Sequence, residues 1–121
     1  MTLNRKAKGA NAERELIHMF WQAGWVAARV AGSGSMQYPS PDIIAAKHPK
    51  SIVIESKVTS QAKQYLDIRQ VEDLKTFARG LNAMPYIAVK FNRIGWYFLS
   101  LEDLPRTETQ FSISPEDAKL K

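Results

Sequence analysis

The sequence predicts an α/β domain in which helices flank a central mixed β-sheet. Two segments, near residues 10–23 and 67–80, repeat apolar residues at helical spacing. Runs rich in β-branched and aromatic residues lie between and after them, in the order helix, strand, hairpin, helix, strand pair. The chain has 121 residues, 45% of them hydrophobic, which is enough for the core of one domain, so residues 1–121 are assigned to a single domain.

The first helix is expected over residues 10–23, with Gly24 as its stop. Its apolar stripe includes Leu16 and Ile17, and counting back three or four residues from these positions reaches Glu13. We therefore expect the Glu13 carboxylate on the buried side of the helix. An acid near a helix N-terminus also interacts favourably with the helix dipole, but that role does not require the apolar side.

A strand, a loop and a hairpin are expected next. The strand covers residues 25–30, and the loop AGSGSMQYPSP follows it at 31–41 with two glycines and two prolines. Apolar runs at 42–46 and 52–58 are separated by only residues 47–51, which is too short for a crossover helix. These two runs should therefore pair as an antiparallel hairpin.

The second helix begins after a polar connection, TSQAKQYLD, at residues 59–67. Asp67 is a suitable N-cap, Gln70 three residues later completes a capping box, and Gly80 marks the end. The remaining expected elements are strands at 85–91 and 94–101 with a turn at 92–93, a short edge strand at 111–113, and a helix start at 114–116.

Composition limits the class of protein. Lys and Arg number 17 against 12 Asp and Glu, which gives a net charge of +5 and favours a polyanionic partner. With no cysteine, the chain has no thiolate nucleophile, thiolate metal site or disulfide. No run approaches the roughly 20 apolar residues of a membrane span, and the N-terminus has no apolar signal segment. We expect a cytoplasmic protein without membrane contact.

Three charged residues interrupt the hairpin that otherwise reads as buried. Glu55 and Lys57 are two apart in a strand and therefore point to one face. If the residue numbers of paired positions in the two strands add to an odd sum, as for 42 opposite 55, the Asp42 side chain lies on the same face as Glu55 and Lys57. An even sum would place Asp42 on the other face. The alternative is that Glu55 and Lys57 form an ordinary ion pair on a solvated face.

Converging carboxylates would suit a hard cation. Asp42 and Glu55 supply the oxygen ligands that Mg²⁺ or Mn²⁺ prefers, and Glu13 could add a further ligand. The remaining positions would take water and a phosphate oxygen. Such a metal lowers the pKa of bound water and neutralises phosphate charge, while the Lys57 ammonium could position water or stabilise the transition state.

The ordered motifs resemble a known family. Pro41-Asp42 followed by Glu55-Ser56-Lys57 resembles the PD…(D/E)xK signature of nucleases with the restriction-endonuclease-like fold. KGANAEREL, RVAGS, PD, ESKVT, AVKF and GWYF together resemble the archaeal Holliday junction resolvases over residues 6 to about 100. The resemblance implies that fold, a homodimer, and metal-dependent, paired symmetric cleavage of four-way DNA junctions with Mg²⁺, for which Mn²⁺ can substitute, and no small-molecule cofactor.

The resemblance also implies roles at matching positions: metal association for Glu13, Asp42 and Glu55, catalysis for these acids with Lys57 and Ser33, and functional contacts at the rim for Arg14 and Arg29. The loop 34–40 is longer than in several family members, so either Ser33 or Ser35 fills the serine role.

Other charged and aromatic residues suggest DNA and dimer contacts. Arg5, Lys6 and Lys8 form a basic N-terminal arm that could follow a phosphate backbone or simply be solvated. Arg14 and Arg29 suit bidentate phosphate contact, although both could be ordinary surface charges. The strip Lys63, Arg69, Lys75 and Arg79 is either a solvated helix face or a binding surface, and His18 and His48 are expected at the surface.

In the strand Trp96-Tyr97-Phe98, alternation sends Tyr97 to one face and its neighbours to the other. One of these faces needs a further partner, which could be a core helix or a two-fold dimer interface. Two other functions compete with junction resolution: a nuclease of the same fold that acts on other branched or duplex DNA, and a DNA-binding module of this fold that does not cleave.

Overall fold

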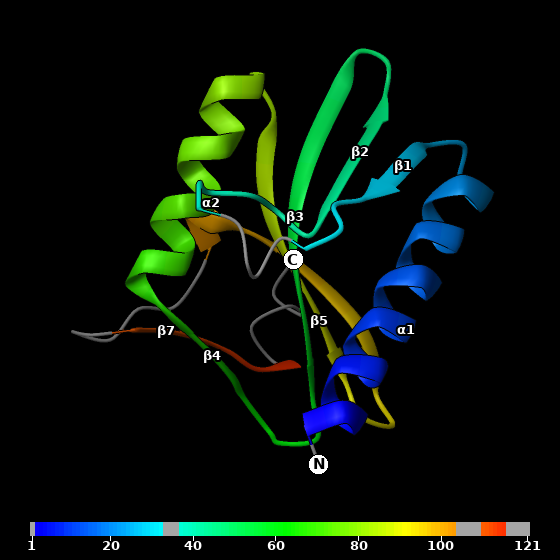
Figure 1. Cartoon of the computed structure of the whole chain (residues 1–121), viewed down its shortest axis with the longest axis vertical. Helices are drawn as coiled ribbons and strands as arrows, with labels where there is room; N and C mark the ends of the chain where they lie inside the picture. Colours follow the sequence, from blue (N-terminus) through cyan, green and yellow to red (C-terminus); the bar gives the residue numbers. More distant parts are fainter. Residues whose placement is uncertain (1, 33–36, 104–109, 116–121) are drawn as a thin grey trace.

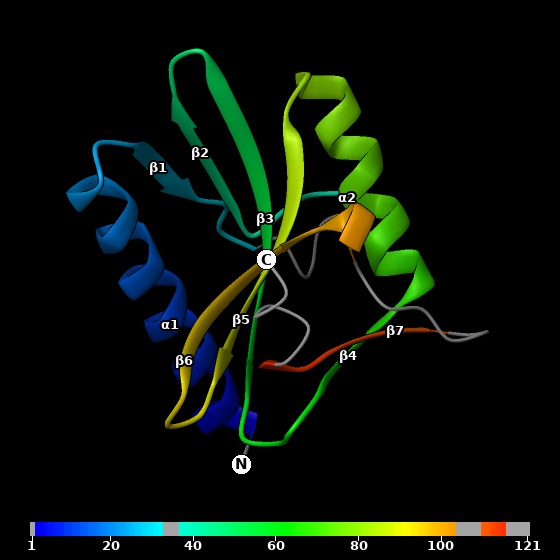
Figure 2. The same cartoon turned by 180° about the vertical axis from the view of Figure 1, so that it is seen from behind.

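A five-stranded mixed sheet forms the centre of the molecule, with one helix on each face (Figures 1 and 2). The computed structural model describes residues 2–32, 37–103 and 110–115. The elements in chain order are α1 (Thr2–Gln22), β1 (Val26–Arg29), β2 (Ile43–Lys47), β3 (Lys50–Thr59), β4 (Gln64–Asp67), α2 (Ile68–Leu81), β5 (Met84–Phe91), β6 (Gly95–Ser100), the 3₁₀ turn η2 (Leu101–Asp103) and β7 (Gln110–Ile113).

The strand order in the sheet is β1-β2-β3-β5-β6. β3 and β5 are parallel and are connected through β4 and α2, whereas the other neighbouring pairs are antiparallel. This arrangement confirms the predicted mixed sheet flanked by helices. β2 and β3 form the predicted hairpin, but its turn is shorter than expected, because only His48 and Pro49 lie between the strands.

Alternating residues of the strands build a core on each face of the sheet. On the α2 face, Val53 and Ile87 are buried with Val71 and Leu74 of the helix. On the α1 face, Leu16 of the helix packs with residues that include Ile43, Ile54 and Ala88. The side chains of Lys90 and Trp96 also donate hydrogen bonds to Glu15 of α1, at 2.8 and 2.7 Å, and these bonds lower the pKa of Glu15.

Helix α1 begins at Thr2, well before the predicted start near residue 10. Arg5, Lys6 and Lys8 therefore lie on helical backbone as part of α1, rather than in an arm that precedes the first helix. Lys, Arg and Ala all have high helix propensity, which favours a helix over these residues. A Cβ at Gly9 would meet nothing within 4 Å, so close packing does not require a glycine at this position. Glu13 is consequently in the middle of a helix, where the helix dipole gives no reason for an acid.

The start of α2 is as predicted, but its end is not. Asp67 accepts a hydrogen bond from the Gln70 backbone N–H at 2.8 Å, and the Gln70 side chain accepts one from the Asp67 N–H at 3.2 Å. The helix continues through Gly80, and Asn82 ends it in the left-handed conformation with φ 55°. Asparagine tolerates this conformation better than most residues, so the glycine was not needed.

The predicted polar connection at 59–67 contains a strand that the sequence analysis missed. β4 pairs antiparallel with β7 in a separate two-stranded sheet. Only Leu66 of β4 is buried, so the strand has no run of apolar residues to reveal it. β7 confirms the predicted edge strand at 111–113. Of the predicted helix start at 114–116, Ser114 and Pro115 are described, with Pro115 in a helical conformation, whereas residues 116–121 lie outside the described part of the chain.

Strand β6 alternates as expected. Tyr97 contacts Phe91 on one side, with ring centroids 5.9 Å apart, and Phe98 contacts Phe20 of α1 on the other, at 6.2 Å. Helix side chains thus cover part of the aromatic surface, although Phe98 is 38% exposed. Within the described residues, no helix combines the length and the apolar character needed to cross a membrane.

Candidate active site

The candidate site lies where β2 ends and β3 continues alone. β2 pairs with β3 from Lys47↔Lys50 to Ile43↔Ile54, while β5 pairs with β3 as far as Thr59. Residues 55–59 therefore have one edge that no described strand covers. Every β2–β3 pair has residue numbers that sum to an odd value, which confirms the register that brings Asp42 beside Glu55.

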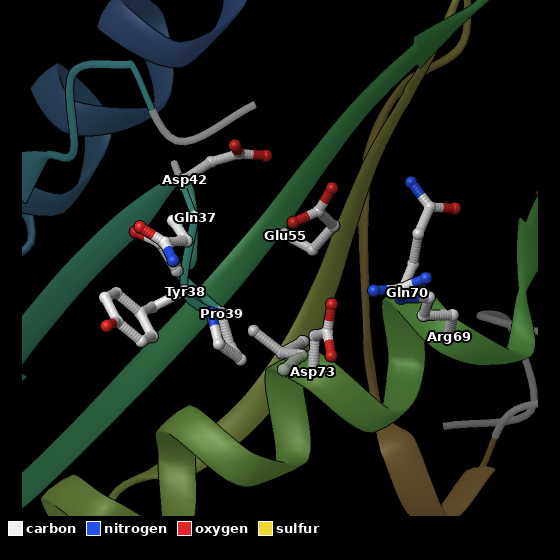
Figure 3. A pocket seen from close by; sticks show the side chains of 10 residues that line it. Gln37, Tyr38, Pro39, Asp42, Glu55, Arg69, Gln70 and Asp73 are labelled. Atoms are coloured by element: carbon white, nitrogen blue, oxygen red, sulfur yellow. The ribbon is translucent and has the colours of Figure 1, made fainter. Parts of the chain in front are cut away.

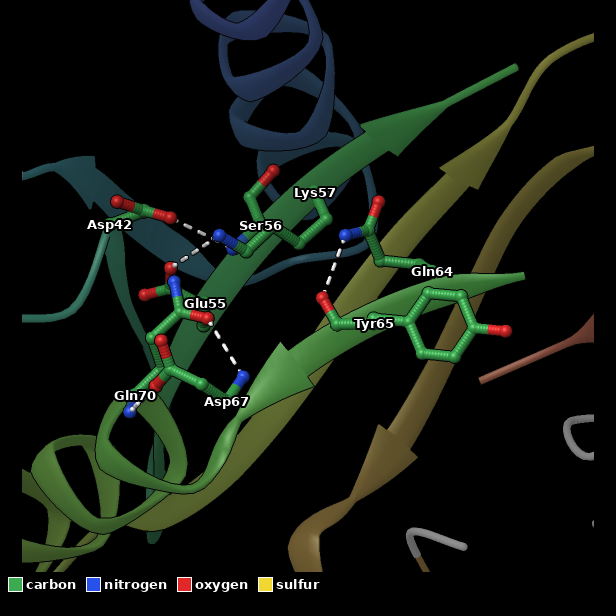
Figure 4. Close-up of polar contacts among 8 residues, drawn as sticks. All are labelled: Asp42, Glu55, Ser56, Lys57, Gln64, Tyr65, Asp67 and Gln70. Atoms are coloured by element: carbon green, nitrogen blue, oxygen red, sulfur yellow. Dashed lines mark hydrogen bonds and ion pairs between the residues drawn. The ribbon is translucent and has the colours of Figure 1, made fainter. Parts of the chain in front are cut away.

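Asp42 is held at this edge by backbone and side-chain hydrogen bonds (Figure 4). Its backbone N–H donates to the Ile54 carbonyl at 3.0 Å, and its own carbonyl accepts from Val30 at 2.8 Å. Its Oδ2 accepts from the Ser56 backbone N–H at 2.9 Å. The carboxylate thus occupies the place where the next rung of the strand pair would be, and it is fixed to the strand that carries Glu55.

Glu55 and Lys57 form an ion pair, with Lys57 Nζ 3.4 Å from Glu55 Oε2. The side chains are only 18% and 25% exposed, respectively, so this is not the fully solvated pair that the alternative interpretation required. Burial, and the nearby charge of Asp42, raise the pKa of Glu55 to about 7, while Lys57 acts in the opposite direction. The two acids are therefore close enough to repel each other.

A pocket of about 420 Å³ opens over the two acids (Figure 3). Besides Asp42 and Glu55, its walls come from residues 37–40 and from the first turns of α2. Arg69 and Asp73 on α2 line the pocket together, as their i, i+4 spacing allows. From the sequence, Arg69 was predicted only as part of a basic strip, and Asp73 and Tyr38 were not predicted to be site residues. The i, i+4 spacing of Arg69 and Asp73 indicates that they share one face of the helix, but it does not show what that face contacts.

Glu13 lies near the acids but is engaged elsewhere. Its Oε1 accepts from Arg29 Nε at 2.5 Å, which ties α1 to β1, and its side chain is 17% exposed. The Glu13 charge contributes in a minor way to the raised pKa of Glu55. Among the residues that the structure describes, no group of three His, Cys, Asp or Glu side chains is placed to hold a metal. A direct ligand role for Glu13 thus stays a prediction.

Two carboxylates nevertheless fit a divalent ion. Mg²⁺ is commonly held by one or two carboxylates and keeps several waters. Asp42 and Glu55 converge in a partly buried pocket where their like charges repel, and a cation between them would remove that repulsion. Their oxygen atoms are the ligand type that Mg²⁺ and Mn²⁺ prefer.

The other residues selected from the sequence are placed as follows. Arg14 is exposed on α1, and its Nη1 donates to Asn11 at 3.2 Å. Lys8 is exposed on the same helix, and His18 and His48 are exposed as expected. Ser33 and Ser35 lie outside the described residues, as do the side chains of Arg5 and Lys6.

The mixed sheet and the Asp-Glu-Lys arrangement are typical of nucleases of the restriction-endonuclease-like class. The chain belongs to the archaeal Holliday junction resolvase family, whose model matches residues 4–120. The resemblance seen in the motifs is thereby confirmed.

Curated relatives agree with this assignment. A crossover junction endodeoxyribonuclease Hjc of Archaeoglobus fulgidus is 44% identical over 108 residues, which cover 89% of this chain and 79% of that protein. The Hjc of Methanocaldococcus jannaschii is 33% identical over 85 residues, covering 70% of this chain and 60% of the relative. A crossover junction endodeoxyribonuclease Hje of Saccharolobus islandicus is 39% identical over 88 residues, with coverages of 71% and 65%.

A solved structure agrees as well. The structure of Archaeoglobus fulgidus Hjc, a Holliday junction resolvase, matches with a TM-score of 0.85 and 40% identity, and the match covers 93% of this chain and 88% of that one.

Proposed function

We propose that this protein resolves four-way DNA junctions by hydrolysing two symmetrically placed phosphodiester bonds. Its relatives are named crossover junction endodeoxyribonucleases, which supports junction DNA as the substrate. The observation that carries the proposal is the convergence of Asp42 and Glu55 beside Lys57 at the end of the β2–β3 pair. Because its substrate is cellular DNA, we place the enzyme in the cytoplasm.

In this proposal Asp42 and Glu55 would hold a divalent ion, Mg²⁺ in the first instance, for which Mn²⁺ could substitute. Such an ion would supply a lowered pKa for a water molecule and positive charge opposite the scissile phosphate. Lys57, 3.4 Å from Glu55, directs its ammonium group at the attacking water or at the charge that develops on the phosphoryl oxygens. The attacking water gives up a proton to solvent as its oxygen bonds to phosphorus, one P–O bond of the strand breaks, and the departing oxygen takes up a proton.

Residues around the acids complete the proposed site. Glu13 orients the guanidinium of Arg29, whose side chain is 35% exposed and can still contact phosphate through its remaining N–H groups. Arg14, which follows Glu13 on α1, offers a second guanidinium. Arg5, Lys6 and Lys8 add positive charge along the first turns of α1. Ser33 or Ser35 would act from the loop that follows β1.

We also propose that the active form is a homodimer. Two symmetric cuts require two sites, and the described part of each chain supplies one pair of converging carboxylates. A largely apolar groove of about 490 Å³, lined by Phe20, Trp25 and Phe98 among others, favours this side of β6 as the contact surface. Sedimentation equilibrium tests it, and a Phe98→Asp variant that remains dimeric would place the interface elsewhere.

The proposed activity is tested with a synthetic four-way junction and a linear duplex of the same sequence. Each is incubated with protein and Mg²⁺, and with EDTA as the control. We expect paired nicks at symmetric positions of the junction, no cleavage of the duplex, and none in EDTA. Equal cutting of both substrates would favour a nuclease for other DNA, and binding without cutting in Mg²⁺ or Mn²⁺ would favour a non-cleaving module.

A further inference from the structure

Another groove, of about 530 Å³, lies between the uncovered end of β3 and the small sheet. We call it the β4 groove. The lining residues that matter below are Lys8, Lys57, Thr59, Lys63, Gln64 and Tyr65. They come from α1, from the uncovered end of β3, and from the β3–β4 connection with β4 itself. Of these residues, only Lys57 and Lys8 have a role in the function proposed above.

The uncovered end of β3 connects the β4 groove to the two acids. Glu55, Lys57 and Thr59 alternate onto one face of the strand, at steps of about 7 Å. Glu55 lines the pocket over the acids, Lys57 contacts Glu55, and Lys57 and Thr59 line the β4 groove. A DNA strand with its scissile phosphate at the acids can therefore continue along β3 into this groove.

The charge of the β4 groove suits a nucleic-acid backbone. Lys8, Lys57 and Lys63 line it, and none of its described lining residues is acidic. Lys8 and Lys63 are exposed, and neither has a carboxylate partner among the described ion pairs. The pocket over the acids differs, because Asp42, Glu55 and Asp73 all line it. The β4 groove thus offers phosphates three lysines without an acidic residue among its described lining.

Packing in the core does not explain why an aromatic residue stands at position 65. Its neighbour Leu66 is 1% exposed in the core, and strand alternation puts Tyr65 on the opposite side, where it is 49% exposed. The described aromatic contacts do not include its ring. Its backbone is fixed by pairing with Ser112, and its carbonyl accepts a hydrogen bond from Gln64 Nε2 at 2.9 Å (Figure 4). A rigid strand therefore presents an exposed ring beside a basic groove.

We infer that the β4 groove holds the nucleotides next to the scissile phosphate, with Lys63 on a phosphate and the Tyr65 ring stacked on a base that has left the duplex stack at the branch point. Exposed aromatic rings beside basic grooves bind single strands in this way, without sequence preference. An unpaired or distorted nucleotide costs least to unstack, so Tyr65 favours a branched substrate over a duplex. Tyr65 thus positions the substrate and takes no part in the chemistry. The inference rests on the proposed function.

The experiment places 2-aminopurine at single positions on either side of the cleavage site of a four-way junction. Fluorescence is measured on binding in EDTA, and single-turnover cleavage is measured in Mg²⁺, for wild type, Tyr65→Phe, Tyr65→Leu and Tyr65→Ala. We expect wild type and Tyr65→Phe to change the fluorescence at one flanking position. Tyr65→Leu and Tyr65→Ala should lose that change and bind the junction roughly 5- to 100-fold more weakly, the range for one lost base–aromatic stack.

Lys63 supplies a second, independent readout. Lys63→Ala should reduce the slope of log affinity against log salt by about one, whereas Lys50→Ala, at the distant β2–β3 turn, should leave it unchanged. Circular dichroism first establishes that each variant is folded.

Failure of the proposed function and failure of the Tyr65 inference give different results. If wild type does not cut the junction in this assay, the proposed function fails. If wild type cuts, but Tyr65→Ala or Tyr65→Leu matches it in fluorescence, affinity and rate, the stacking role is wrong. An unchanged salt slope in Lys63→Ala would likewise remove the β4 groove from the DNA path.

Discussion

The Asp42 carboxylate accepts a hydrogen bond from the backbone N–H of Ser56 at 2.9 Å. This bond replaces the next rung of the β2–β3 pair and joins one acid to the strand that carries the other. The position of Asp42 is therefore set by backbone geometry, and a neutral side chain of the same shape should remain there. This relationship makes it possible to remove the charge without removing the fold.

Asp42→Asn and Glu55→Gln should each lower junction cleavage by at least about 100-fold while junction binding stays nearly unchanged, because each removes a proposed metal ligand and keeps its volume. Cleavage is measured under single-turnover conditions and binding by gel shift in EDTA. Isothermal titration with Mn²⁺ checks that metal affinity falls. Loss of binding in parallel with cleavage would show that these residues are structural.

Glu55 predicts a pH dependence of stability. Its ordinary pKa is 4.5, and burial with the Asp42 charge raises it to about 7 in the folded protein. The folded state therefore binds more protons than the unfolded state between these values, so the metal-free protein should lose stability as pH rises from about 4.5 to 7. The loss attributable to Glu55 is up to about 3 kcal/mol.

Urea unfolding in EDTA at pH 5 and pH 8 measures this loss, and Glu55→Gln is the comparison, since it should abolish that part of the slope. Added Mg²⁺ or Mn²⁺ should restore stability mainly above pH 7, because the metal needs the ionised carboxylate. A Glu55→Gln variant with the wild-type pH slope would mean that another group titrates.

The pair of Glu13 and Arg29 should matter more for cleavage than for stability. Both side chains are partly exposed, and such pairs contribute about 0.2–1 kcal/mol. We expect Glu13→Gln and Arg29→Gln to show a coupling below about 1 kcal/mol in a double-mutant cycle of urea unfolding, yet to lower single-turnover cleavage by roughly 10-fold or more. Cleavage losses no larger than the stability change would assign the pair a structural role.

Lys8→Ala should weaken junction binding modestly and reduce the salt slope of the affinity by about one, the contribution of one phosphate contact. Lys75→Ala is a suitable control, because Lys75 lies on α2 beside Glu72, 3.6 Å away. Fluorescence anisotropy over a range of salt concentrations gives both slopes. Equal slopes for wild type and Lys8→Ala would take α1 out of the DNA interface at this position.

The capping box of α2 supports the pocket wall. Asp67→Ala should destabilise the protein by about 1 kcal/mol, because it leaves the Gln70 N–H without its side-chain acceptor, whereas Asp67→Asn should cost less. Urea denaturation measures both variants. Since Arg69 and Asp73 follow directly on this helix, Asp67→Ala should also slow cleavage; equal stability of Asp67→Ala and Asp67→Asn would contradict the capping role.

Local patterns in the sequence determined much of this protein. The Asp67 and Gln70 spacing predicted the start of α2, because capping involves residues within one turn. The alternation of Glu55 and Lys57 placed both on one face, and the short gap before β3 predicted a hairpin. The family motifs then indicated which acid would stand beside Glu55. Apart from the family motifs, these inferences depend on contacts between residues close in sequence or on a two-residue period.

Only the tertiary structure decided what met these local elements. The register of β2 against β3 selected the odd pairing, and the packing of α1 gave Glu13 to Arg29. β4 became a strand because β7, more than forty residues away, supplied its hydrogen bonds. Helix α2 brought Arg69 and Asp73 to the acids by packing across the sheet. Periodicity fixes the direction of a side chain within its element, whereas its partner depends on burial and pairing between segments far apart in the chain.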